Sequence, residues 1–179
     1  DPKQARGFFA PGLDTRFSDV IDGLTNTVAM AEIGTPDSRN TLGNLAINQP
    51  DRFLENPSSC GELFNPMEPR EFADEVLLST SGRGSRWADG AAGFSLINTV
   101  LPPLSANIAI GGDETADGFY SAGSFHPGGS HVLMGDGAVL FITENIDSGD
   151  RSHPTATEEE MDVQCIESPH GHEAIDESF

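Results

Sequence analysis

The sequence predicts an α+β domain that consists mainly of antiparallel β-sheet, with short helices at its periphery. Its 179 residues include 20 glycines and 12 prolines but only 36% hydrophobic residues, which favours short strands joined by many turns over a helical bundle. In addition, two β-prone runs, residues 131–134 and 138–143, flank the turn sequence Gly135-Asp136-Gly137. A short Gly/Asp segment between two such runs is the strongest local indication of a β-hairpin.

The hairpin over residues 130–143 is expected to be the centre of the fold. Its two runs do not alternate cleanly between apolar and polar residues, which indicates that other structure covers both faces. Phe141 is accordingly expected to be buried, and its replacement by alanine to cost about 3–5 kcal/mol of stability.

The other expected elements are short. Residues 27–33 predict a strand, although alanine, methionine and glutamate also favour helix. Residues 94–101 predict a further strand, which two consecutive prolines end. A helical turn is expected at residues 19–22. The segment 41–70, rich in Asn, Pro, Ser and Gly, predicts loops with short helical turns.

The chain divides into a domain and an extension. Residues 1–147 are expected to form one β-rich domain. Residues 148–179 are acidic, contain the run Glu158-Glu159-Glu160 and have few large apolar side chains. Because such a segment buries little apolar surface, we expect a loosely ordered C-terminal extension rather than a second domain.

The charge is strongly negative, with 29 acidic and 9 basic residues and a formal net charge of -20. Such a chain repels nucleic acids and anionic membrane surfaces, which excludes both as expected partners. The charge is explained either by solubility or by the binding of divalent cations through oxygen ligands. Composition leaves both explanations open.

One acidic loop resembles the first half of a calcium-binding loop. Asp113, Thr115 and Asp117 place oxygen-bearing side chains at alternate positions before a glycine. The acidic residue that would close an EF-hand is replaced by Ser124. An acidic surface loop is the alternative. No cofactor is required on either interpretation, and calcium is the candidate ion.

His126 and Asp136 suggest a catalytic dyad, but strand geometry argues against it. An extended chain rises about 3.3 Å per residue, so a strand over residues 131–134 separates the two side chains. Asp136 and Gly137 are therefore expected to form the turn, and the His126 side chain to bond to local backbone. A hydrolase that uses His126 or His131 with an acidic partner is the least favoured function, and no Gly-x-Ser-x-Gly motif is present.

Two further sets of residues invite an interpretation. Cys60 and Cys165 would pair as a disulfide in an extracellular protein and stay reduced otherwise. Arg83, Arg86 and Trp87 form a small cluster in an otherwise acidic chain. Because Arg and Trp are enriched at binding hot spots, this cluster is a candidate contact patch. Alternatively, Trp87 covers an edge of the core.

Four segments in this order resemble one family. The first is DGLTNTVAMAE, residues 22–32, and the second is RWADG, residues 86–90, followed by NTVLPP, residues 98–103. The third is His126 followed after nine residues by Asp136-Gly137, and the fourth is FITENID, residues 141–147. Together they resemble the domain of unknown function 1559, a family abundant in planctomycete-type bacteria whose members look like prepilins or type II secretion pseudopilins.

The resemblance implies a pilin-like globular head in an extracellular, periplasmic or cell-surface location. Its implied partners are other pilin-like subunits or surface components. No catalytic residues carry over from the family, so a non-enzymatic structural module is expected. The alternative is an extracellular module that binds calcium or glycans through residues 113–117 and Trp87.

Family members begin with a prepilin-type cleavage motif and a long apolar helix, which the sequence beginning at Asp1 does not contain. We therefore expect these residues to make no direct membrane contact. We expect the full-length protein to be anchored by an N-terminal helix upstream of Asp1.

Overall fold

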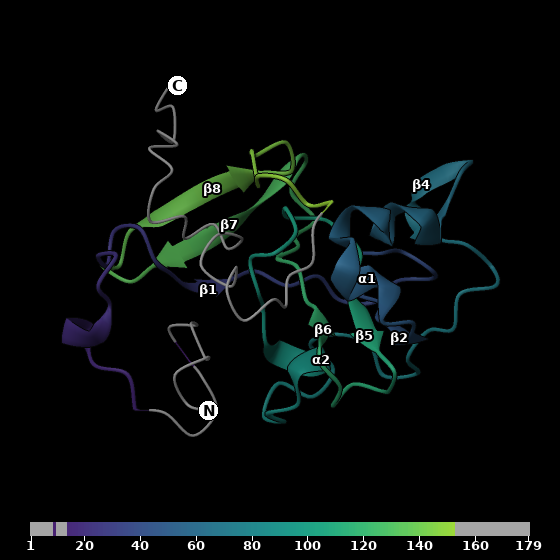
Figure 1. Ribbon diagram of the computed structural model, residues 1–179, viewed down its shortest axis with the longest axis horizontal. Coiled ribbons are helices and arrows are strands. Elements are labelled where there is room, and N and C mark those ends of the chain that lie inside the picture. The colour runs from purple at the N-terminus through teal and green to yellow at the C-terminus, as the bar shows by residue number, and fades with distance from the viewer. Residues whose placement is uncertain (1–8, 10–13, 153–179) are drawn as a thin grey trace.

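The described part of the protein consists of two three-stranded sheets and a two-stranded ribbon, joined by long loops and very short helices (Figure 1). The computed structural model describes residue 9 and residues 14–152. Most strand pairs are antiparallel, which confirms the predicted α+β class with peripheral helices. The seven residues of the longest described helical segment cannot cross a bilayer, and no other described helix can either.

The first sheet has the strand order β1-β7-β8 and contains the predicted hairpin. Its strands are β1 (Val28–Ala31), β7 (Gly129–Met134) and β8 (Val139–Thr143). The hairpin turn forms as predicted. Gly137 has a φ of 92°, a left-handed conformation that glycine adopts without strain. The Asp136 carboxylate accepts a hydrogen bond of 2.9 Å from the backbone N–H of Ala138.

The second sheet has the strand order β2-β5-β6 and includes a parallel pair. Its strands are β2 (Ala46–Gln49), β5 (Ile108–Ile110) and β6 (Gly118–Phe119). Strand β2 lies in the segment 41–70, for which loops and helical turns were expected. That expectation is wrong for residues 46–49, and also for residues 64–65 and 68–70, which form strands of the ribbon described below. Figure 1 shows the two sheets next to each other along the longest axis of the molecule.

The remaining elements are short. The ribbon pairs β3 (Phe64–Asn65) with β4 (Glu68–Phe72). The helical segments are η2 (Phe17–Asp19), α1 (Arg52–Glu55), η3 (Pro57–Leu63) and α2 (Ala92–Ser95). The helical turn expected at residues 19–22 is instead found at Phe17–Asp19, and residues 20–22 are not helical.

The predicted strand over residues 94–101 is not formed, because this segment begins inside α2 and continues without regular structure. The side chain of Asn98 explains the difference. Its amide donates to the carbonyl of Gly118 at 2.8 Å, and its oxygen accepts from the N–H of Tyr120 at 3.3 Å. These contacts hold the segment beside β6 in place of a ladder of backbone hydrogen bonds.

The main hydrophobic core lies around the second sheet and not around the hairpin. Phe53 and Ile108 are completely buried there, together with Phe72 and Phe119. Beneath the first sheet, the buried cluster is limited to Val132, Met134 and Ile142. The expectation that the hairpin is the centre of the core is therefore wrong.

The outer face of the hairpin is exposed, which also corrects the expectation for Phe141. Ile142 is 5% exposed, whereas Phe141 is 43% and Val139 64% exposed. The strand thus alternates between a covered and an open face. The Phe141 ring lies across the outer face, over Gly129 and against the ring of His131, with the two ring centroids 5.1 Å apart.

Cys60 is buried in the main core with 3% of its surface exposed. Its predicted partner, Cys165, lies outside the described residues, so the disulfide stays a prediction. Burial raises the pKa of the Cys60 thiol to about 12. As a thiol it is therefore unreactive at neutral pH. Most of the predicted extension, residues 153–179, also lies outside the described residues.

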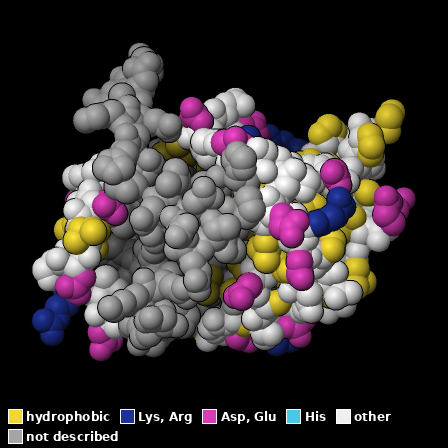
Figure 2. Space-filling view, in the orientation of Figure 1, with side chains coloured by type: hydrophobic (Ala, Val, Ile, Leu, Met, Phe, Trp, Pro, Cys, Tyr) yellow, Lys and Arg dark blue, Asp and Glu magenta, His cyan; other side chains and the backbone are white. Residues whose placement is uncertain are grey.

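Acidic side chains are spread over the described part of the molecular face in Figure 2 and do not gather in one patch. This distribution agrees with the interpretation that the net charge of -20 serves solubility.

Only part of the predicted contact patch lies at the surface. Arg83 is 0% exposed, whereas Trp87 is 85% exposed, and the Arg86 side chain lies 5.1 Å from the ring centroid of Phe94. Only Arg86 and Trp87 face outward, so the expectation that Arg83 is part of a surface patch is wrong.

The positive charge of the buried Arg83 guanidinium is only partly compensated by hydrogen bonds. Its Nη2 donates to the carbonyl of Leu96 at 2.7 Å, and the guanidinium lies 5.4 Å from the ring centroid of Tyr120. Its Nε and Nη1 have no hydrogen-bond partner among the residues that the structure describes. Burial lowers the pKa of Arg83 to about 10, because the charged form loses its hydration.

Two Phe→Ala substitutions test the location of the core. Phe53→Ala is expected to cost about 3–5 kcal/mol in the free energy of unfolding, because it empties a fully buried site. Phe141→Ala removes a side chain that is 43% exposed and is expected to cost about 1–2 kcal/mol. Urea denaturation followed by circular dichroism compares them. Equal costs would place Phe141 in the core after all.

A second pair of substitutions tests whether Arg83 acts as a packing residue or as a charge. Arg83→Ala is expected to cost about 2–5 kcal/mol, because it leaves a cavity. Arg83→Met fills a similar volume without a buried charge. Its free energy of unfolding is expected to lie within about 1 kcal/mol of the wild-type value or to exceed it. The same urea denaturation measures both. A loss for Arg83→Met as large as that for Arg83→Ala would show that the buried charge itself is stabilising.

Candidate functional site

Within the described residues, one group of three side chains with metal-ligand chemistry comes together: Glu32, His126 and His131. Glu32 directly follows β1, His126 lies in the loop before β7, and His131 lies in β7. The Glu32 carboxylate is 3.2 Å from Nδ1 of His131 and 3.6 Å from Nε2 of His126. The sequence predicted that the His126 side chain bonds to local backbone. The structure instead turns it toward a distant carboxylate, which corrects this expectation.

The pairing of β1 with β7 positions two of the three residues. The N–H of Glu32 donates to the carbonyl of His131 at 3.1 Å, which continues the ladder one residue beyond β1. In return, the N–H of His131 donates to the Glu32 carboxylate at 2.9 Å. The carbonyl of Glu32 accepts a further bond from the N–H of Gly123 at 2.8 Å. Both the backbone and the side chain of Glu32 are therefore held in place.

A compact turn carries His126 to the same place. The hydroxyl of Ser124 donates to the carbonyl of Gly129 at 2.8 Å and accepts from the N–H of His126 at 3.1 Å. Gly128, between them, has a φ of 78°, which favours glycine. The sequence Pro127-Gly128-Gly129 thus reverses the chain before β7 begins.

The cluster is polar and open to solvent. The side chains of Glu32, His131 and His126 are 39%, 41% and 54% exposed. The backbone N–H of His131 holds the pKa of the Glu32 carboxyl below its usual value, and the two imidazoles act in the same direction. The two imidazole rings meet edge to face, with centroids 4.8 Å apart. A negatively charged carboxylate thus faces two imidazoles at the surface.

Asp136 takes no part in this cluster. It lies in the turn after β7, whereas His126 lies before β7 begins. The N–H of Asp136 donates to the carbonyl of Leu24 at 3.2 Å, and its carboxylate closes the turn. The histidine and the Asp-Gly pair of the third block therefore lie beyond opposite ends of one strand.

The candidate calcium loop lies between β5 and β6. The Asp113 carboxylate accepts hydrogen bonds from the N–H of Thr115 at 2.9 Å and from its hydroxyl at 2.7 Å. These bonds lower the pKa of Asp113, the backbone N–H more than the hydroxyl. The backbone carbonyl of Asp117 accepts from the N–H of Ile110 at 2.8 Å. These hydrogen bonds stabilise a local turn within the protein itself. Calcium binding stays a prediction.

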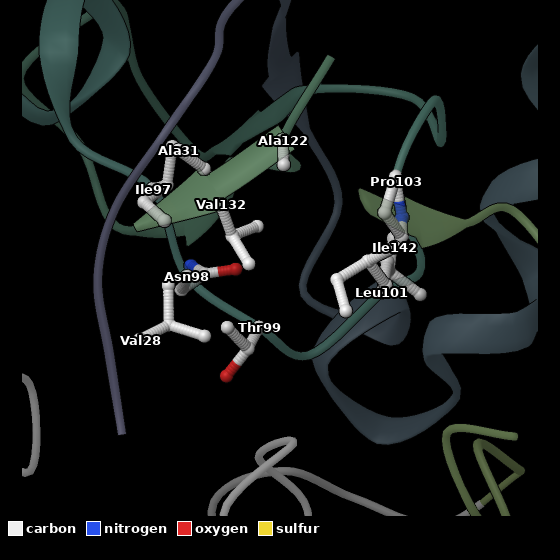
Figure 3. Close-up of a pocket in the computed structure, with 10 residues that line it drawn as sticks. All are labelled: Val28, Ala31, Ile97, Asn98, Thr99, Leu101, Pro103, Ala122, Val132 and Ile142. Carbon is white, nitrogen blue, oxygen red and sulfur yellow. The ribbon is translucent and has the colours of Figure 1, made fainter. Parts of the chain in front are cut away.

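A small cavity lies beneath the first sheet. It has a volume of about 20 Å³ and lies between that sheet and the segment that follows α2. Figure 3 shows the apolar side chains of Val28, Val132, Leu101 and Ile142 around it, together with the polar side chains of Asn98 and Thr99. This volume is enough for about one water molecule. It does not accommodate an organic substrate.

Comparisons with known proteins identify the family. No curated protein and no solved structure matches the chain. A family model described as a protein of unknown function, DUF1559, matches residues 1–149. The matched range contains all four sequence blocks that resemble this family, so the resemblance is confirmed. The chain therefore belongs to the DUF1559 family.

Proposed function

We propose that the chain is a non-enzymatic structural module of the pilin or pseudopilin type, located outside the cytoplasm. Membership of the DUF1559 family is consistent with this role. The proposal rests on the observation that the sequence blocks typical of the family stabilise the fold. The first, third and fourth blocks bond to one another through backbone groups, and no block surrounds a substrate-sized cavity in the described part of the chain.

The first and third blocks are hydrogen-bonded to each other at the hairpin turn. The carbonyl of Thr27 accepts from the N–H of Gly135 at 2.8 Å, and the carbonyl of Leu24 accepts from the N–H of Asp136 at 3.2 Å. The hydroxyl of Thr27 donates to the carbonyl of Gly23 at 3.0 Å, which holds the first block in its own turn. These residues therefore stabilise the fold.

The second block is also used structurally. Asn98 bonds through its side chain and its backbone to the chain around β6, and Leu101 is 4% exposed in the main core. In an enzyme, characteristic residues converge on the reacting atoms. Here the block residues named above bond at the joints between strands, which fits a structural module. Glu32 and His126 are the exceptions, because they meet in the solvent-exposed cluster.

Arg86 and Trp87 supply the surface best suited to contact other subunits or surface components. Trp87 is 85% exposed in the turn segment before α2, beside the exposed Arg86. Large aromatic and Arg side chains are the residues that most often dominate protein interfaces. The strongly acidic remainder of the chain disfavours nucleic acid as a partner.

The location is tested in cells that produce the full-length protein. Protease is added to intact cells and, separately, to cells with a permeabilised outer membrane. We expect cleavage in one of these samples while a cytoplasmic marker stays intact. Cleavage that occurs only together with that of the cytoplasmic marker would contradict the proposal.

The contact surface is tested by cross-linking in the same cells. We expect cross-linked products that contain a second pilin-like subunit or a surface component. Trp87→Ala is expected to reduce their yield without changing the unfolding midpoint of the purified protein. Met67→Ala is the matched control, because Met67 is 84% exposed but belongs to the ribbon. Equal yields from both variants would exclude Trp87 from the interface.

A further inference from the structure

We propose that Glu32, His126 and His131 bind one divalent transition-metal ion of the zinc type. Two imidazole nitrogens and one carboxylate are the protein ligands of a known class of zinc site, in which the fourth position is left to water. Imidazole also distinguishes this site from a calcium site, which requires oxygen ligands. The exposed position of the cluster leaves room for the water ligand.

The observed distances fit such an ion. With bonds of about 2.0–2.1 Å and tetrahedral angles, two ligands of one zinc ion lie about 3.3 Å apart. Glu32 Oε2 is 3.2 Å from His131 Nδ1, and the other carboxylate oxygen, Oε1, is 3.6 Å from His126 Nε2. All three ligand atoms lie within 4.8 Å of one another. The widest pair therefore has to close by at most about 1.5 Å.

His126 is the residue that makes this adjustment. Its side chain is 54% exposed and lies in a loop, so its ring can turn without disturbing the core. Glu32 and His131 are fixed to each other by two hydrogen bonds from backbone N–H groups. Two ligands are thus preorganised and the third closes on the ion.

Supporting contacts surround the ligands as they do in metal sites. The carboxylate of Glu32 accepts a hydrogen bond of 2.9 Å from the backbone N–H of His131, and metal-bound carboxylates are commonly hydrogen-bonded in this way. The ring of Phe141 packs against His131, with centroids 5.1 Å apart. Ser124 fixes the turn that presents His126.

Stability alone does not account for the cluster. An exposed pair between a carboxylate and a charged side chain contributes about 0–1 kcal/mol. One histidine would suffice for such a pair, yet two imidazoles meet at a single carboxylate. The net charge of -20 also attracts cations to the surface. A bound ion would link the end of β1 to β7 and to the loop before β7, and so stabilise the folded state.

The full chain offers a sharp test, because it has five histidines and two of them belong to the cluster. The protein is first stripped with a chelator and then titrated with Zn²⁺ by calorimetry and with Co²⁺ by visible absorption. We expect one ion per chain, the absorption bands of tetrahedral Co²⁺ and a higher melting temperature with Zn²⁺. The control variant His153→Ala/His170→Ala/His172→Ala retains only His126 and His131 and is expected to bind as the wild type does.

In this control background, His126→Ala is expected to weaken Zn²⁺ binding by at least about 100-fold, since the loss of a supporting residue alone costs about 10–100-fold. Glu32→Gln is expected to act in the same direction while preserving the side-chain shape. Unfolding of both variants without metal, followed by circular dichroism, confirms that they fold. An unchanged affinity in His126→Ala would overturn the proposal. So would a loss of binding in the triple variant, or an absence of binding by the wild type.

Discussion

The antiparallel pairing of β1 with β7 is the constraint on which the rest of the structure depends. It joins residues far apart in the chain, because Glu32 and His131 are separated by 99 positions in the sequence. The pairing sets the first sheet, closes the cavity beneath it and fixes the hairpin turn against the first sequence block. It also creates the carboxylate–imidazole cluster. Without it, β7 and β8 would form an isolated hairpin, which is marginally stable in water.

The parts of the fold that could be predicted from the sequence are those with local causes. The Asp136-Gly137 turn follows from the conformational needs of two adjacent residues, and β1 from a short β-prone run. Strand β2 could not be predicted, because its short run acquires strand geometry only by pairing with β5, far along the chain. The expected burial of Phe141 was wrong, because an apolar run does not reveal which face of a sheet is exposed to solvent.

The candidate site depends even more on tertiary structure. No spacing in the sequence relates Glu32 to His126 or His131, so the strand pairing and the turn before β7 are needed to bring them together. Arg83 lies in a Gly/Ser-rich segment that is typical of exposed loops. The segment folds inward because Ser79 accepts hydrogen bonds from Ser81 and Gly82, and the N–H of Arg83 reaches the carbonyl of Gly43. The amino-acid composition of the segment does not predict these contacts.

The distance between β1 and β7 along the chain has a consequence during synthesis. A ribosome adds about 5–20 residues per second, so β1 waits roughly 5–20 s for its partner strand to be made. During that interval β1 has an unpaired edge, which is a template for association with other chains. The first sheet can close only when nearly the whole domain has been made, so the nascent chain stays partly unfolded until late. Under the location outside the cytoplasm proposed above, this delay would be an advantage, because premature folding would block passage of the chain through a membrane pore.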